Sequence, residues 1–143
     1  MRSTLIACAV AIVLGVSAVM AQSPIREGRW EITVQMQIPN MPTGMPPQKI
    51  VQCITKGHLA DPGKALPGGP DPNDKNALCK VSDYKTSGNK ITWNLACSGP
   101  NAMSGSGEIV VDGDSYKGAM NMKSDKGDMA MKYSAKRLGD CTE

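Results

Sequence analysis

Apolar and polar residues alternate with a period of two over residues 30–38. The apolar positions are Trp30, Ile32, Val34, Met36 and Ile38, and each residue between them is polar. Successive side chains of a strand point to opposite faces of a sheet. The pattern therefore predicts a strand with one face on a hydrophobic core and the other in water.

The pattern after residue 38 also favours strands. The further runs that predict them span residues 49–54, 79–86, 90–97, 108–111, 115–123 and 129–137. Residues 55–60 predict a single helical turn, and the Pro- and Gly-rich residues 61–76 predict a loop. Asp112 and Gly113 predict a type I′ turn. We therefore expect an all-β fold, an antiparallel meander of six to seven strands in a curled sheet or partly closed barrel.

The first 21 residues have a different pattern. Arg2 is the only charge before a mostly apolar run over residues 5–20, which closes on Val19, Met20 and Ala21. A short apolar run that ends on small residues is typical of a secretory signal peptide. We expect a signal helix, cleaved after Ala21 on export through the Sec pathway, and a single domain over residues 22–143. No stable membrane insertion is expected once the leader is removed.

The composition limits how this domain fills its core and what it binds. The chain has no Phe and ten Met. Methionine adapts to irregular gaps, so it can replace aromatic residues in a core. The formal net charge of +3 is too balanced to favour nucleic acid as a partner.

The cysteines give the domain a second source of stability. Cys8 is lost with the leader, and the four that remain are Cys53, Cys79, Cys97 and Cys141. An even number in a small exported domain predicts two disulfides. A zinc site is the alternative, but the chain has no C-x-x-C pair and one histidine, His58.

The turn between the runs 79–86 and 90–97 bears on the pairing. A three-residue turn over 87–89 would set Cys79 opposite Cys97 on one face, whereas a two-residue turn would put them on opposite faces. We prefer Cys79 with Cys97, which leaves Cys53 with Cys141.

Several short motifs lie along the whole of residues 22–143. They are Gly28-Arg29-Trp30-Glu31, Cys53 with Thr55, Cys79 leading to Asp83-Tyr84, Ser87-Gly88, Trp93, Cys97, Gly105-Ser106-Gly107, Gly113 to Gly118, and Lys136 to Cys141. In these motifs the chain resembles an uncharacterised family of exported bacterial proteins, the domain-of-unknown-function family 3617. The resemblance implies a small periplasmic protein of Gram-negative bacteria and lends no activity.

Two methionine pairs are the sharpest candidate for a binding site. Met120 and Met122 share a face of one predicted strand, and Met129 and Met131 share a face of the next. A hairpin at 124–128 would bring the four together, where soft thioethers could bind copper as Cu(I), with Met41 and Met45 as further ligands. The alternative is that these sulfurs fill the core of a sheet without Phe, and no other cofactor is expected.

A curled sheet could also enclose a small lipophilic ligand, with Trp30 and Trp93 lining the cavity.

Catalysis is not expected, because His58 stands alone and no nucleophile motif is present. Gly105 and Gly107 are interpreted as flexibility at a strand edge. We therefore expect a non-enzymatic binding or structural module of the cell envelope. Its partner would be a small ligand or an acidic envelope component that meets the basic residues Lys117, Lys123, Lys126, Lys132, Lys136 and Arg137.

Overall fold

The computed structural model describes residues 23–39, 45–61, 64, 66, 78–100 and 102–141. The expected leader over residues 1–21, Met41 and most of the loop 61–76 lie outside the described residues.

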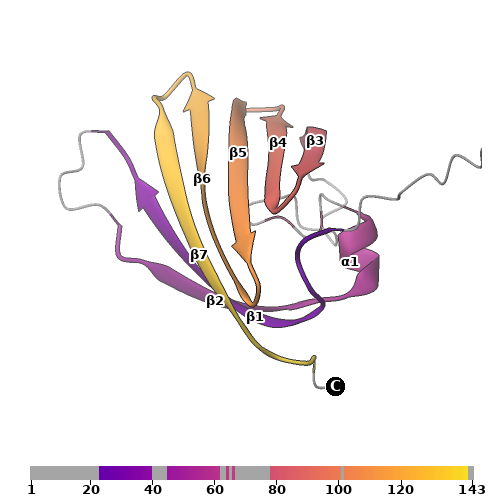
Figure 1. The fold of residues 1–143 in the computed structure, drawn as a ribbon. Coiled ribbons are helices and arrows are strands. Elements are labelled where there is room, and N and C mark those ends of the chain that lie inside the picture. The colour runs from indigo at the N-terminus through magenta and orange to yellow at the C-terminus, as the bar shows by residue number, and fades with distance from the viewer. Residues whose placement is uncertain are drawn as a thin grey trace, which may run out of the picture.

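One antiparallel sheet of seven strands dominates the described part of the chain (Figure 1). The strands are β1 (Gly28–Gln37), β2 (Gln48–Ile54), β3 (Cys79–Ser87), β4 (Lys90–Cys97), β5 (Met103–Asp112), β6 (Ser115–Ser124) and β7 (Met129–Gly139). The short helix α1 (Lys56–Ala60) follows β2, as the sequence predicts. The sheet curls without closing into a barrel, so the expected all-β class and curled sheet are confirmed.

The strand order shows where the fold departs from a simple meander. The order is β2-β1-β7-β6-β5-β4-β3. Strands β3 to β7 follow one another as predicted, but the β1–β2 hairpin pairs with β7. In that pairing Ile32 faces Ala135 and Val34 faces Tyr133. The first and last strands therefore lie side by side, and β2 and β3 form the two edges.

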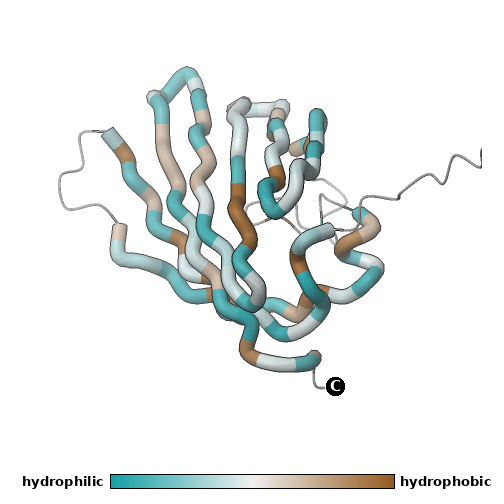
Figure 2. Tube along the Cα trace, viewed as in Figure 1, coloured by the Kyte–Doolittle hydropathy of each residue, from teal (hydrophilic) through white to brown (hydrophobic). Residues whose placement is uncertain are grey.

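The hydrophobic core lies on one face of the sheet, which we call the inner face, and the opposite face is called the outer face. Figure 2 shows apolar and polar residues alternating along the strands, and the buried side chains among the described residues are all apolar or aromatic. The most deeply buried side chains are those of Trp30, Tyr116, Ile54, Ile91, Ile109 and Met120. Ile25 and Leu66, from segments outside the sheet, are buried in the same cluster. One continuous core therefore covers the inner face.

Glycines on the inner face of β5 make room for larger neighbours. A Cβ added at Gly107 would overlap the Trp93 indole, and one at Gly105 would overlap the Met122 sulfur and the Asn121 carbonyl. Both glycines lie inside β5 and are paired across it. The interpretation of Gly105 and Gly107 as strand-edge flexibility is therefore wrong, because they permit close packing in the sheet interior.

The β3–β4 hairpin has the expected cysteine register but not the expected turn. Its turn has two residues, since Ser87 pairs with Lys90, so the three-residue turn expected over 87–89 is wrong. Further along, Ser82 faces Asn94 and Lys85 faces Thr92, so that two residues of β3 stand opposite Trp93. This β-bulge adds the residue that the turn lacks.

The effect of the bulge is to set Cys79 directly opposite Cys97. The two form one disulfide, and Cys53 with Cys141 forms the other.

The β5–β6 turn also differs from expectation. Asp112 pairs with Ser115, so the turn residues are Gly113 and Asp114. Gly113 has a φ of 55°. Asp114 does not have a positive φ, because Asp83 is the only residue other than glycine that does in the described part of the chain. A type I′ turn needs positive φ at both positions, so the expected type I′ is wrong and the φ angles fit type II′.

Candidate functional site

The structure brings the four predicted methionines together on the inner face. Met120 stands opposite Met131, and Met122 stands opposite Met129. A fifth residue, Met36 of β1, stands on the other side of Met131. We call these five residues the methionine cluster. The sequence pattern did not link Met36 to the cluster, because that link depends on the pairing of β1 with β7.

The cluster runs from the core toward the surface. Met120 and Met122 are buried, and Met36, Met129 and Met131 are half-buried. Met45, expected as a further ligand, is exposed and borders the same small hollow as Met36. Met120 and Met122 therefore contribute to the core, and the other three side chains are partly exposed to solvent.

Tyr133 connects two members of the cluster. Its hydroxyl lies 3.6 Å from Sδ of Met120 and 3.6 Å from Sδ of Met131. Burial raises the pKa of Tyr133 to about 12, because a buried phenolate loses its hydration. At neutral pH the hydroxyl is therefore protonated, and its one hydrogen is donated to one or the other thioether sulfur, both of which are weak acceptors.

A pocket opens beside the cluster, where β1 ends and the β6–β7 hairpin turns. Its volume is about 520 Å³. The residues that line it are Gln37, Ile38, Pro39, Asn121, Met122, Lys123, Asp128, Met129 and Ala130. We call this hollow the methionine pocket. Thioether and aliphatic groups form its wall, and two charged side chains stand among its lining residues.

The two tryptophans expected to line a cavity lie in the core. Trp30 is fully buried and donates from Nε1 to the Arg26 carbonyl at 3.0 Å. Its ring lies 5.5 Å from that of Tyr116. Trp93 is 2% exposed and packs over Gly107. Neither tryptophan lines the methionine pocket, but Trp93 borders a separate hollow of about 370 Å³.

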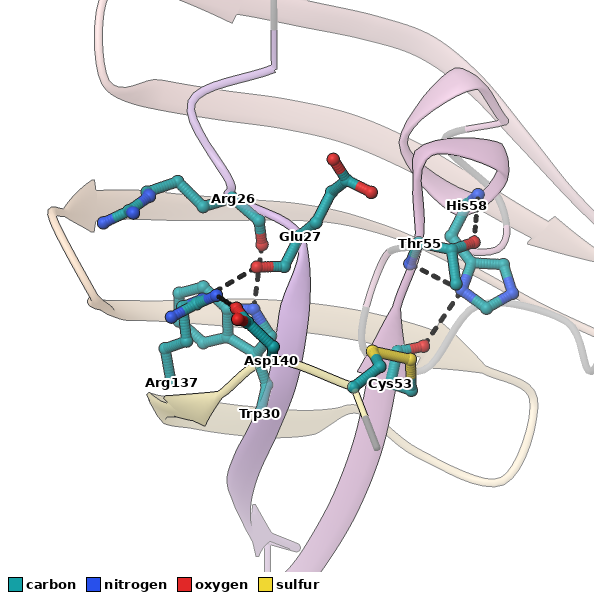
Figure 3. Close-up of a disulfide and its surroundings, with 9 residues drawn as sticks. Arg26, Glu27, Trp30, Cys53, Thr55, His58, Arg137 and Asp140 are labelled. Carbon is teal, nitrogen blue, oxygen red and sulfur yellow. Dashed lines mark hydrogen bonds and ion pairs between the residues drawn. A yellow bond between two sulfur atoms is a disulfide. The ribbon is translucent and has the colours of Figure 1, made fainter. Parts of the chain in front are cut away.

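A second hollow lies at the opposite end of β1 and is bordered by Cys141, whose disulfide with Cys53 is drawn in Figure 3. Its volume is about 880 Å³, and its lining mixes Ile25, Ile54 and Leu59 with charged residues. The disulfide joins β2 to the segment after β7, across β1. The charged residues that line this hollow form ion pairs within the chain, which are Arg26 with Asp114 at 2.9 Å, Lys56 with Glu27 at 3.9 Å, and Arg137 with Asp140.

Arg137 contacts the chain on both sides at this end of the sheet. Its Nε donates to the Glu27 carbonyl at 2.7 Å, and its guanidinium pairs with Asp140 (Figure 3). A Cβ at Gly28, whose φ is +138°, would overlap Arg137 and the Gly139 carbonyl. Because the Arg137 side chain is only 16% exposed, it does not belong to the basic surface that the sequence suggested.

His58 has a structural role. It occupies the third position of α1, where its backbone N–H bonds to the Thr55 hydroxyl and its Nδ1 faces the Thr55 N–H. Nδ1 also lies 3.1 Å from the Cys53 carbonyl oxygen (Figure 3). The spacing Thr55-x-x-His58 is that of a capping box. This signal for a structural role of His58 was present in the sequence but was not recognised there.

Four lysines of the expected basic surface lie on β6 and β7. Lys117, Lys123, Lys132 and Lys136 are exposed on the outer face of β6 and β7. Within the described residues, no three side chains of His, Cys, Asp or Glu converge as metal ligands. In the same part of the chain, no helix has the length and hydropathy needed to span a membrane. The two disulfides indicate an oxidising compartment outside the cytoplasm.

A match to a known protein family spans nearly all of the described fold. A family model described as "Protein of unknown function (DUF3617)" matches residues 25–141, from Ile25 in the core to Cys141 in the disulfide. No curated protein and no solved structure matches the chain. Because the match spans all seven strands and both disulfides, the chain belongs to the DUF3617 family.

Proposed function

We propose that this protein is a non-enzymatic binding module of the bacterial periplasm, which holds a small apolar ligand in the methionine pocket. The observation that carries the proposal is the position of Met122 and Met129. They form a cross-strand pair on the core face and also line an open hollow of about 520 Å³. This volume is within the usual range for small-molecule sites.

The chemistry of the pocket suits an apolar ligand of variable shape. Thioether side chains are flexible and polarisable, so they adapt to different ligands. Gln37, Asn121, Lys123 and Asp128 stand among the lining residues and can orient a polar end of the ligand.

The histidine and the cysteines have structural roles, which supports a non-enzymatic function. The lone histidine, His58, caps a helix, and the four cysteines of residues 22–143 form disulfides. The disulfides together with the leader pattern support Sec export to the periplasm.

The proposal is tested by titration with 1-anilinonaphthalene-8-sulfonate, a fluorescent probe of apolar sites, and by native mass spectrometry of the purified protein. Met129→Lys places a charge in the pocket, and we expect it to raise the dissociation constant of the probe about tenfold. Val110→Lys, on an exposed residue of the outer face, is the matched control and should change nothing. Wild-type protein that neither enhances probe fluorescence nor carries a co-purified ligand would end the proposal.

A second candidate function is binding of Cu(I) by the same cluster. Two observations favour it. Met36, Met131 and Met120 occupy neighbouring positions on three adjacent strands, and the sulfurs of the last two both lie 3.6 Å from the Tyr133 hydroxyl. Soft thioether ligands select Cu(I) over harder cations.

Competition against a chromogenic Cu(I) chelator under anaerobic conditions tests this candidate. Replacing Met36, Met120 and Met131 with Leu keeps the volume of the core and should abolish Cu(I) binding. Equal affinity in the triple variant, or wild-type binding weaker than micromolar, would exclude copper.

A further inference from the structure

The two edges of the sheet are protected to different degrees. The β3 edge carries Lys80 and Lys85 and the bulge at Asp83. Lysines and bulges are the usual means by which proteins prevent pairing at an edge strand. The β2 edge has no bulge in its pairing with β1, and its one lysine, Lys49, is bound to Glu31 at 3.2 Å.

The β2 edge also exposes two β-branched residues. Ile50 is 49% exposed and Val51 is 56% exposed, the two largest values for β-branched side chains among the exposed hydrophobic residues described. They project to opposite faces, since Ile50 stands opposite the buried Ile32 and Val51 stands opposite Glu31. An edge strand with a regular register and exposed β-branched residues is a surface on which another strand can pair.

The sequence of β2 fits a second copy of itself. Residues 48–52 read Gln-Lys-Ile-Val-Gln, in which the two Gln are placed symmetrically about Ile50 and Lys49 and Val51 exchange places. In an antiparallel pair with a two-fold axis at Ile50, each Gln48 faces the other copy's Gln52, and the two Ile50 side chains meet. Lys49 faces Val51, so no two like charges stand opposite each other. A two-fold interface requires this kind of self-complementarity.

We propose that β2 pairs antiparallel with β2 of a second copy, so that the two sheets become continuous across a homodimer. Gln48, Ile50 and Gln52 lie opposite Val34, Ile32 and Trp30, so they lie on the inner-face side, and the pair extends that face. Pro46 and Pro47, just before β2, lack N–H donors and would face residues 54 and 53 of the other copy, so they limit the pairing to residues 48–52. This proposal goes beyond the binding function, because the methionine pocket lies apart from β2.

Sedimentation velocity over a concentration series tests the dimer. We expect wild-type protein to shift from monomer to dimer as its concentration rises. Ile50→Lys and Val51→Lys should each raise the dimer dissociation constant at least about tenfold. Ser82→Lys, at an exposed position of the β3 edge, is the matched control and should leave dimerisation unchanged. Circular dichroism confirms that each variant is folded.

Hydrogen exchange locates the interface independently. The amides of residues 48–52 that point away from β1 should become protected as concentration rises, whereas those of β3 should not. A wild-type protein that stays monomeric at the highest soluble concentration would overturn the proposal. So would a dimer that survives Ile50→Lys and dissociates in Ser82→Lys.

Discussion

Asn94 donates a hydrogen bond of 2.8 Å from Nδ2 to Oδ2 of Asp83, next to the bulge that returns Cys79 to a position opposite Cys97. Asp83 has a φ of 50°, in the left-handed region that few residues other than Gly, Asn and Asp adopt. A local backbone conformation on one edge strand thus decides whether the disulfide of that hairpin can form.

We therefore predict that Asp83 tolerates only residues that adopt positive φ. Asp83→Val should lower the free energy of unfolding by about 1–3 kcal/mol, because a β-branched residue is strained there. Asp83→Asn should be close to wild type. Ser82→Val, one residue earlier, is the control, and urea denaturation measures all three. An Asp83→Val variant as stable as the control would show that the bulge carries no strain.

Both disulfides should stabilise the fold, and the longer loop should contribute more. The Cys79–Cys97 bond closes 18 residues and the Cys53–Cys141 bond closes 88. Loop entropy predicts losses of about 3 and about 4.5 kcal/mol when each pair is replaced by Ala. Thermal melting of the two double variants, with and without dithiothreitol, measures the difference. An unchanged melting temperature of the wild type in dithiothreitol would contradict the prediction.

Gly107→Ala should destabilise the protein, because the added Cβ overlaps the Trp93 indole. We expect a loss of about 1–3 kcal/mol and a shift in tryptophan fluorescence. Gly57→Ala is the matched control, since the nearest atom to its new Cβ is the Thr55 hydroxyl at 3.7 Å. In the helix this change should be neutral or slightly stabilising. Equal effects of the two substitutions would refute close packing at Gly107.

The two buried tyrosines should respond differently to loss of the hydroxyl. Oη of Tyr116 is buried with no hydrogen-bond partner among the described residues, whereas that of Tyr133 has the sulfurs of Met120 and Met131 as alternative acceptors. Tyr116→Phe should therefore leave stability unchanged or raise it by up to about 1 kcal/mol. Tyr133→Phe should lower it by about 0.5–1 kcal/mol. The reverse order in chemical denaturation would contradict these assignments.

Stability should also fall in strong alkali. Burial raises the pKa of Tyr133 from 10.0 to about 12, so the folded protein holds this proton more tightly than the unfolded chain. The stabilisation is fully present below the unfolded pKa, and it is lost as pH rises from about 10 to about 12. Denaturation at several alkaline pH values should show the decline, and Tyr133→Phe should reduce it. A decline unaffected by that substitution would assign the loss to other groups.

Local pattern was enough to predict most of the fold. The alternation from Trp30 to Ile38 specified β1 and its buried face, because a strand's side chains alternate whatever its neighbours are. The spacing of Met120, Met122, Met129 and Met131 likewise placed them on one face, since a short hairpin makes its two strands antiparallel neighbours. The four cysteines of residues 22–143 indicated two disulfides by number alone.

The rest depended on contacts between residues far apart in the chain. The pairing of β1 with β7 brought Met36 beside Met131 and buried Arg137 against the Glu27 carbonyl, and no local pattern encodes which strands become neighbours. The bulge at Asp83 preserved the cysteine register that the two-residue turn alone would have broken. The sequence by itself thus determined the strands, their buried faces and the number of disulfides. Only the tertiary structure decided the strand order, the register and the open hollow beside the methionines, because these depend on how whole strands pack together.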